Sequence, residues 1–157
     1  MKIGSISENR QEDKRVAITP DIIKKYKSLG FEINLAENYA SHLGIKDEEY
    51  KSQGVNILKT DEEVLLSSDA ILQMNIISQE NLNKLKNNQI LVGVLNPYKN
   101  KEKLKEISSK KINCFSLEML PRITRAQSMD ILSSQANLAG YKAVVDAFAF
   151  YQKAIPM

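Results

Sequence analysis

The chain has 157 residues, of which 43% are hydrophobic and 26% are charged, and its formal net charge is +3. This composition is typical of one soluble globular domain, and the evenly dispersed charge argues against nucleic acid as a partner, because phosphate-binding proteins concentrate their positive charge. No stretch approaches the ~18 continuous apolar residues of a membrane span and no signal-peptide pattern is present, so we expect a cytosolic protein without direct membrane insertion.

Short apolar runs alternate with amphipathic, charge-rich stretches along the chain, a pattern typical of βαβ units. The first predicted helix, 19–30, has Thr19 at its N-cap, Pro20 at its first position and Gly30 at its end. The predicted strands are residues 2–7, 31–36, 54–58, 69–75, 89–96 and 111–119, and the other predicted helices are residues 60–68, 79–87, 99–109 and 133–155. We expect the last of these helices to end at Pro156.

These elements predict an α/β fold with three layers. A mainly parallel sheet is flanked by helices, as in flavodoxin-like or Rossmann-like proteins, and the chain ends in a long helix. The six glycines form neither a G-x-G-x-x-G nor a Walker-type loop. The sequence therefore lacks the usual device for holding a pyrophosphate.

Two chemically versatile side chains occur once each. Cys114 lies in the apolar run INCFSLEML, so we expect a buried and inert thiol. His42 lies in YASHLGI, and we interpret it as a surface or capping residue. We expect no metal site.

All four arginines fall in two short segments, whereas the other eighteen basic residues (22 minus 4) are lysines. Residues 8–20, ENRQEDKRVAITP, carry two of the arginines, and residues 121–130, PRITRAQSMD, carry the other two. A guanidinium binds carboxylate, phosphate or amide oxygens with two donors at fixed geometry, which an ammonium does not. Both segments follow predicted strands, whose carboxyl ends form the ligand-binding edge of a parallel sheet. We predict a site there; the alternative is that the arginines are ordinary surface charges clustered by chance.

These segments resemble one protein family. Residues 8–20 match the opening motif E-x-R-x-x-E-x-R-V-A-x-T-P of the alanine dehydrogenase and pyridine nucleotide transhydrogenase family. Residues 120–144, LPRITRAQSMDILSSQANLAGYKAV, are similar to the corresponding stretch of the proton-translocating NAD(P) transhydrogenase alpha subunits. The resemblance implies that residues 1–132 form the N-terminal lobe of a two-lobed unit. Residues 133–157 would then be a long helix leading to a missing Rossmann NAD-binding lobe, which accounts for the absent glycine loop.

The branches of this family differ in the chemistry that they require. Resemblance to the alanine dehydrogenases implies a lysine and a histidine on later loops, but the corresponding strand ends here carry Met74, Asn75 and Asn96. Direct hydride transfer between two nicotinamides needs placement and no general acid or base. The sequence therefore favours the transhydrogenase branch.

Resemblance to the transhydrogenases assigns roles to four residues. Arg122, Gln127 and Asp130 match a loop that lies over the nicotinamide of NAD(H), and Ser133 either contacts the ligand or caps the helix. The amide of Gln127 presents a donor and an acceptor, which matches the nicotinamide carboxamide. Asp130 is expected to hold Arg122 or the ribose hydroxyls, and Arg15 to form an ion pair.

The function implied by the resemblance is positioning of the nicotinamide for hydride transfer between NADH and NADP+, with NADP(H) on a partner subunit. The chain would be part of an enzyme complex and inactive alone. Its expected partners are the missing Rossmann lobe, the membrane and NADP-binding subunits and a second copy in a homodimer. Its expected location is cytoplasmic, peripheral to the inner membrane through those subunits. The alternatives are a non-catalytic flavodoxin-like binding module and a lobe of an alanine dehydrogenase-like enzyme.

Overall fold

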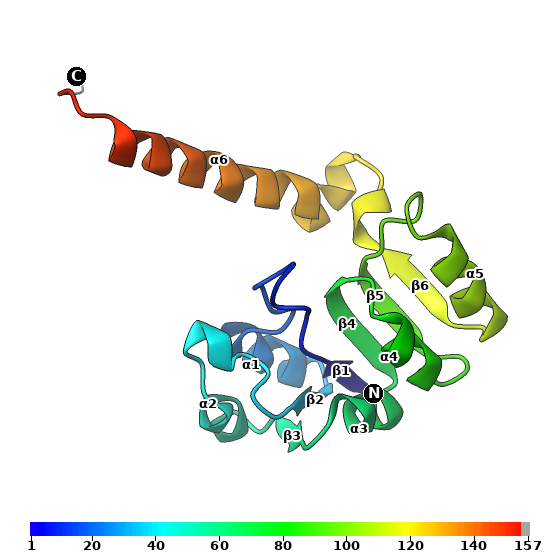
Figure 1. The fold of residues 1–157 in the computed structure, drawn as a ribbon. Coiled ribbons are helices and arrows are strands. Elements are labelled where there is room, and N and C mark those ends of the chain that lie inside the picture. Colours follow the sequence, from blue (N-terminus) through cyan, green and yellow to red (C-terminus); the bar gives the residue numbers. More distant parts are fainter. Residues whose placement is uncertain (155–157) are drawn as a thin grey trace. The chain divides into compact units, whose positions relative to one another are not determined.

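The structure, a computed structural model, describes residues 1–154 and contains a six-stranded sheet. The strands are β1 (Lys2–Ser5), β2 (Glu32–Ala36), β3 (Asn56–Leu58), β4 (Ala70–Asn75), β5 (Ile90–Val94) and β6 (Asn113–Ser116). Their order is β3-β2-β1-β4-β5-β6, and every neighbouring pair is parallel (Figure 1). The predicted α/β fold with a parallel sheet is therefore confirmed.

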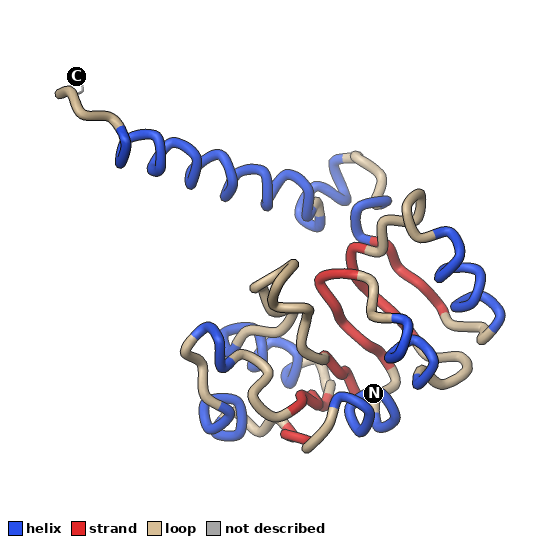
Figure 2. The backbone as a smooth tube through the Cα atoms, in the orientation of Figure 1, coloured by secondary structure: helices blue, strands red, loops and turns tan. Residues whose placement is uncertain are grey.

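The helices follow the predicted alternation with the strands (Figure 2). They are α1 (Pro20–Ser28), α2 (Asp47–Ser52), α3 (Asp61–Ser67), α4 (Gln79–Lys84), α5 (Lys101–Ser109) and α6 (Ile131–Phe150), with 3-10 turns η1 (Ser41–Leu43), η2 (Leu117–Met119) and η3 (Thr124–Met129). The long helix α6 begins at Ile131, two residues before the predicted start, because the side chain of Asp130 caps it. It ends at Phe150 because Tyr151 is extended, and the expected stop at Pro156 lies outside the described residues.

Helices pack on both faces of the sheet through two separate apolar clusters. Helices α1 and α2 contribute Ile23 and Tyr50 to one cluster, together with Leu35 of β2. Helices α3, α4 and α5 pack in the other cluster, where Ile71 of β4 and Leu91 of β5 are fully buried. The connections therefore change face between β1 and β4, and ligands of open parallel sheets bind at such a change, beyond the carboxyl ends of the strands.

The chain divides into two compact units, Met1–Ser116 and Leu117–Met157. The first unit holds the whole sheet, and the second holds η2, η3 and α6. The expected boundary after residue 132 would separate the loop before α6 from its helix. The contacts group them instead, because η2 packs against α6 and Asp130 caps it.

Cys114 is exposed, so the expectation of a buried thiol is wrong. The reason is its place on β6, which pairs with β5 alone and forms an edge of the sheet. Partial burial still raises the pKa of the Cys114 thiol above its usual value.

We expect Gly93→Ala to lower the free energy of unfolding by about 2–3 kcal/mol, measured by urea unfolding. A Cβ at Gly93 would lie 2.5 Å from the backbone oxygen of Gln73, and no side-chain rotation relieves that overlap. The control is Gly140→Ala in α6, where a Cβ meets nothing within 4 Å and alanine favours the helix by about 1 kcal/mol. Equal stability of the Gly93→Ala variant and the parent would contradict the close approach of β4 and β5.

Candidate functional site

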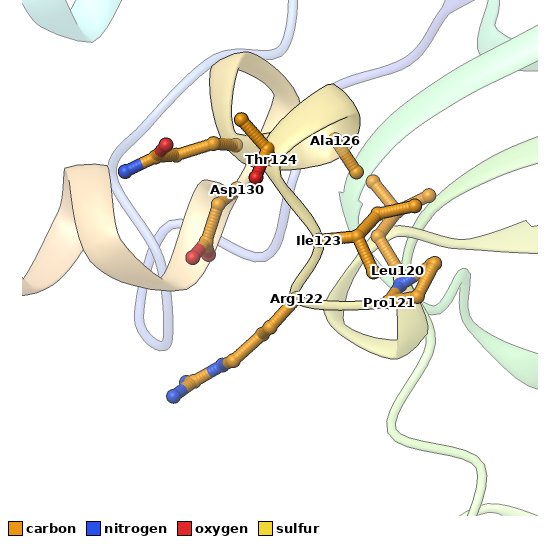
Figure 3. A pocket seen from close by; sticks show the side chains of 8 residues that line it. Leu120, Pro121, Arg122, Ile123, Thr124, Ala126 and Asp130 are labelled. Carbon is orange, nitrogen blue, oxygen red and sulfur yellow. The ribbon is translucent and has the colours of Figure 1, made fainter.

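The loop before α6 surrounds a cavity of about 280 Å³ (Figure 3). Its lining residues are Leu120, Pro121, Arg122, Ile123, Thr124, Ala126, Gln127 and Asp130. Three of the four residues expected to bind the cofactor, Arg122, Gln127 and Asp130, are thus brought together, and Ser133 does not line the cavity.

Short-range hydrogen bonds give this loop its shape. The backbone N–H of Ile123 donates to the carbonyl of Pro121 at 2.9 Å, and the N–H of Ala126 donates to the carbonyl of Ile123 at 2.9 Å. Ala126 is buried, which anchors η3, whereas Arg122 and Gln127 are exposed. Figure 3 shows the apolar Pro121 and Ile123 on one side of the loop and Arg122 extending away from them.

The side chains of Arg122 and Gln127 have no hydrogen-bond or ion-pair partner within the described residues of their unit. Their donors are therefore free to bind a ligand. Because the loop is ordered by its own backbone contacts, both side chains project from a fixed base, as placement of a ligand requires.

Asp130 joins the loop to α6. Its Oδ1 accepts hydrogen bonds from the backbone N–H groups of Leu132 and Ser133, both at 3.0 Å, and the Ser133 hydroxyl donates to Oδ2 at 2.7 Å. These bonds, that from the Ser133 hydroxyl foremost, hold the pKa of Asp130 below its usual value, and the charge of Arg122 contributes less. The helix is therefore capped by an ionised Asp130 rather than by Ser133.

The other arginine segment is tied to an irregularity in β4. The register of β4 against β5 shifts between Leu72 and Asn75. Glu8 Oε1 accepts hydrogen bonds from the backbone N–H of Met74 at 2.6 Å and from Gln73 Nε2 at 3.0 Å. Burial of Glu8 raises the pKa of its carboxyl group, although its bonds from backbone N–H groups act against the rise.

Asn75 extends this network to Arg15. Its Nδ2 donates to Asp13 Oδ2 at 2.9 Å, and Arg15 Nη2 donates to the same oxygen at 2.6 Å. The Arg15 guanidinium holds the pKa of the Asp13 carboxyl far below its usual value. The expected ion pair of Arg15 is thus confirmed, with Asp13 as its partner.

Two further contacts hold the same loop. Arg10 Nη2 donates to the carbonyl of Asn38 at 3.0 Å. His42 Nε2 lies 2.7 Å from the carbonyl of Lys14, and because a carbonyl only accepts, this nitrogen carries the hydrogen. His42 therefore anchors a loop, in keeping with its interpretation as a residue without a catalytic role.

A second cavity, of about 560 Å³, lies beside Glu8 at the carboxyl ends of β1 and β4. Its charged lining residues are Glu8, Glu12, Asp61 and Lys103, so acidic groups outnumber the single basic one. This balance opposes the binding of a pyrophosphate. Arg15 belongs to the first unit and Arg122 to the second, so the expectation that both segments share one binding edge remains a prediction.

The described residues offer neither a bilayer-spanning helix nor a metal-binding cluster. Across residues 1–154, no helix is both long enough and apolar enough to traverse a lipid bilayer. The same residues contain no group of three or more histidine, cysteine or acidic side chains arranged to hold a metal ion.

Comparison with known proteins relates both units to one family. Residues 4–139 match the family described as alanine dehydrogenase/PNT, N-terminal domain. An NAD(P) transhydrogenase subunit alpha polypeptide of Rickettsia prowazekii (strain Madrid E) is 37% identical to the chain, across all of the chain and 42% of that relative. The crystal structure of transhydrogenase from Sinorhizobium meliloti has a TM-score of 0.91 and 34% identity, covering the whole chain and 47% of its own.

An L-alanine dehydrogenase structure shares the fold over 75% of the chain, with a TM-score of 0.70 and 15% identity. The chain therefore spans less than half the length of the relatives that it matches along its whole length.

Proposed function

Because this chain belongs to the alanine dehydrogenase/PNT N-terminal domain family, we propose that it is the N-terminal portion of the NAD(H)-binding component of a proton-translocating NAD(P) transhydrogenase. In this proposal the component binds NAD(H), and a partner subunit binds NADP(H). The chain would act only together with the polypeptide that supplies the second, Rossmann lobe. Membrane and NADP-binding subunits, and a second copy of the component, complete the proposed assembly on the cytoplasmic side of the inner membrane.

The observation that carries this proposal is the pair of free polar side chains on an ordered loop. Gln127 presents an amide donor and acceptor that fit the carboxamide of a nicotinamide, and Arg122 adds a charged donor. NAD(H) would supply the hydride, and the chain's own residues would fix the rotation of its ring.

Asp130 and Ser133 have a different role in the proposed site. Asp130 is committed to the first turn of α6, so it positions the loop relative to that helix. Its ionised carboxylate adds a negative charge beside the cavity, to which ribose hydroxyls can donate. Ser133 donates its hydroxyl hydrogen to Asp130, which leaves its oxygen able to accept from a ligand.

The lining of the loop cavity contains neither histidine nor lysine. Transfer of a hydride between two nicotinamides moves no proton at the reacting carbons, so the reaction requires orientation and no general base. A polar loop of this composition suits that chemistry.

Reconstitution tests the proposal. The chain is mixed with a polypeptide carrying the remaining portion of the Rickettsia relative and with the partner subunits, and reduction of an NADP+ analogue by NADH is followed. We expect transfer only when the chain is present, because the remaining portion alone lacks the positioning loop.

The remaining portion and the partner subunits without the chain serve as the control. If they transfer hydride at the same rate as the full mixture, the chain is a non-catalytic binding module. If the full mixture reduces the analogue no faster than buffer does, the transhydrogenase assignment is wrong.

A further inference from the structure

One face of the sheet in the first unit is covered along only half of its width. Helices α1 and α2 pack over the side that contains β2 and β3, in the cluster of Ile23, Tyr50 and Leu35. Helices α3, α4 and α5 all contribute to the cluster on the opposite face. No described helix of this unit therefore covers β4, β5 and β6 on the face that α1 and α2 share.

The register identifies the residues of that uncovered area. Leu72, Val92 and Phe115 lie side by side on three neighbouring strands. Leu72 packs at the margin of the cluster formed by α1 and α2, which fixes the face to which this row belongs. Ile90 and Val94 share that face because side chains alternate along a strand. We call these five residues the outer apolar face.

Exposure increases across this face toward the edge of the sheet. Leu72, Ile90, Val92 and Val94 are half-buried, and Phe115 on the edge strand is 57% exposed. On the opposite side of the same strands, Leu91 is fully buried. An aromatic ring at the end of an apolar row is an unusual residue to leave in water, because its burial contributes about 1.5–3 kcal/mol.

The shape of this area suits one helix. Strands of parallel sheets normally have both faces covered, and helices provide that cover. Three strands spaced ~4.8 Å apart span roughly 10 Å, about the diameter of a helix with its side chains. The half-buried residues thus outline the space of one missing layer element.

The relatives indicate where that helix comes from. The chain covers 42% of the Rickettsia relative and 47% of the Sinorhizobium structure, so more than half of each has no counterpart here. We propose that the outer apolar face is the docking surface for a helix from this remaining portion, which binds with its own apolar side against Val92 and Phe115. The proposal rests on the proposed function for the identity of the partner, but it concerns contact and not transfer.

Thiol labelling tests the proposal on the full 157-residue chain, with the remaining portion of the Rickettsia relative as the probe. The first protein carries Phe115→Cys in a Cys114→Ser background, and the matched control is the parent, whose only thiol is Cys114. Cys114 is the adjacent residue, pairs with Leu91 and lies beside Leu104 and Ile107 of α5, on the opposite face of the same strand. We expect addition of the remaining portion to slow labelling at position 115 at least tenfold and at Cys114 less than twofold.

The alternative occupants give other results, each of which overturns the proposal. Protection at position 115 that grows with the concentration of the chain alone would assign the face to a second copy. Protection in the dilute chain alone would assign it to α6 of the same chain. Unchanged labelling at position 115 in a mixture that associates, as judged by sedimentation, would show that the partner binds elsewhere.

A second pair of variants keeps the test independent of labelling. Phe115→Asp should weaken association with the remaining portion by at least tenfold, and Cys114→Asp should leave it within twofold. Equal effects of the two variants would overturn the proposal. Because neither experiment uses NADH, the docking proposal can fail while reconstituted hydride transfer persists, and the reverse also holds.

Discussion

The 157-residue chain alone should bind NADH with a dissociation constant above about 1 mM, equivalent to no more than ~4 kcal/mol of binding free energy. The sequence has no glycine loop to surround a pyrophosphate. The loop cavity offers Arg122 and Gln127 to one end of the dinucleotide, and the cavity beside Glu8 has an acidic lining that disfavours phosphate. Isothermal titration calorimetry of the chain with NADH measures this constant.

The same titration on the chain combined with the remaining portion of a relative provides the comparison. We expect the affinity to rise at least 100-fold, because the second lobe would supply the phosphate and adenosine contacts. A micromolar constant for the chain alone, roughly 8 kcal/mol, would show that a complete nucleotide site exists within these residues. The assignment to one lobe of a two-lobed component would then be wrong.

Local sequence signals predicted the elements because their causes are local. Pro20 at the first position of α1 and Gly30 just beyond its end, with a φ of 81°, limit that helix, as the sequence indicated. The six apolar runs all form strands, since each is short and followed by a charged amphipathic stretch. Helix α2 was not predicted, because it has six residues and a single buried apolar side chain, Tyr50, so it shows no periodicity.

The contacts of the first arginine segment were beyond sequence reasoning because they join distant residues. Glu8 and Met74 are 66 positions apart, and Asn75 and Asp13 are 62 apart. Their pairing depends on an irregularity in β4 that no pattern in the strand announces. Glu8 was therefore assigned only a structural role, without its partners. The motif did place Arg15 correctly in an ion pair, since an acidic residue lies two positions before it.

The second segment was easier to interpret, because its contacts are short-range. Arg122, Gln127 and Asp130 lie within one loop, so their meeting around one cavity follows from local turns. Ser133 was separated from this group by the early start of α6. An aspartate is as good an N-cap as a serine, and the sequence offers both near the start of the helix.

Gln127→Ala should lower the rate of hydride transfer on the order of 100-fold in the reconstituted complex, with little change in NADH affinity. A misplaced reactant costs about 2.7 kcal/mol of activation free energy, whereas the second lobe would supply most of the binding. An interaction used mainly for placement appears in the rate and not in the dissociation constant. Stopped-flow transfer and NADH titration of the same preparation separate the two quantities.

Two further variants decide whether the amide itself is responsible. Gln127→Met keeps the length of the side chain and removes its donor and acceptor, so it should be as slow as Gln127→Ala if the amide orients the ring. Lys142→Ala removes only an exposed ion pair with Asp146 on α6, and it should stay within twofold of the parent. Full activity of Gln127→Met beside a slow Gln127→Ala would mean that the side chain fills space. Transfer within about twofold of the parent in both would mean that Gln127 does not position the nicotinamide.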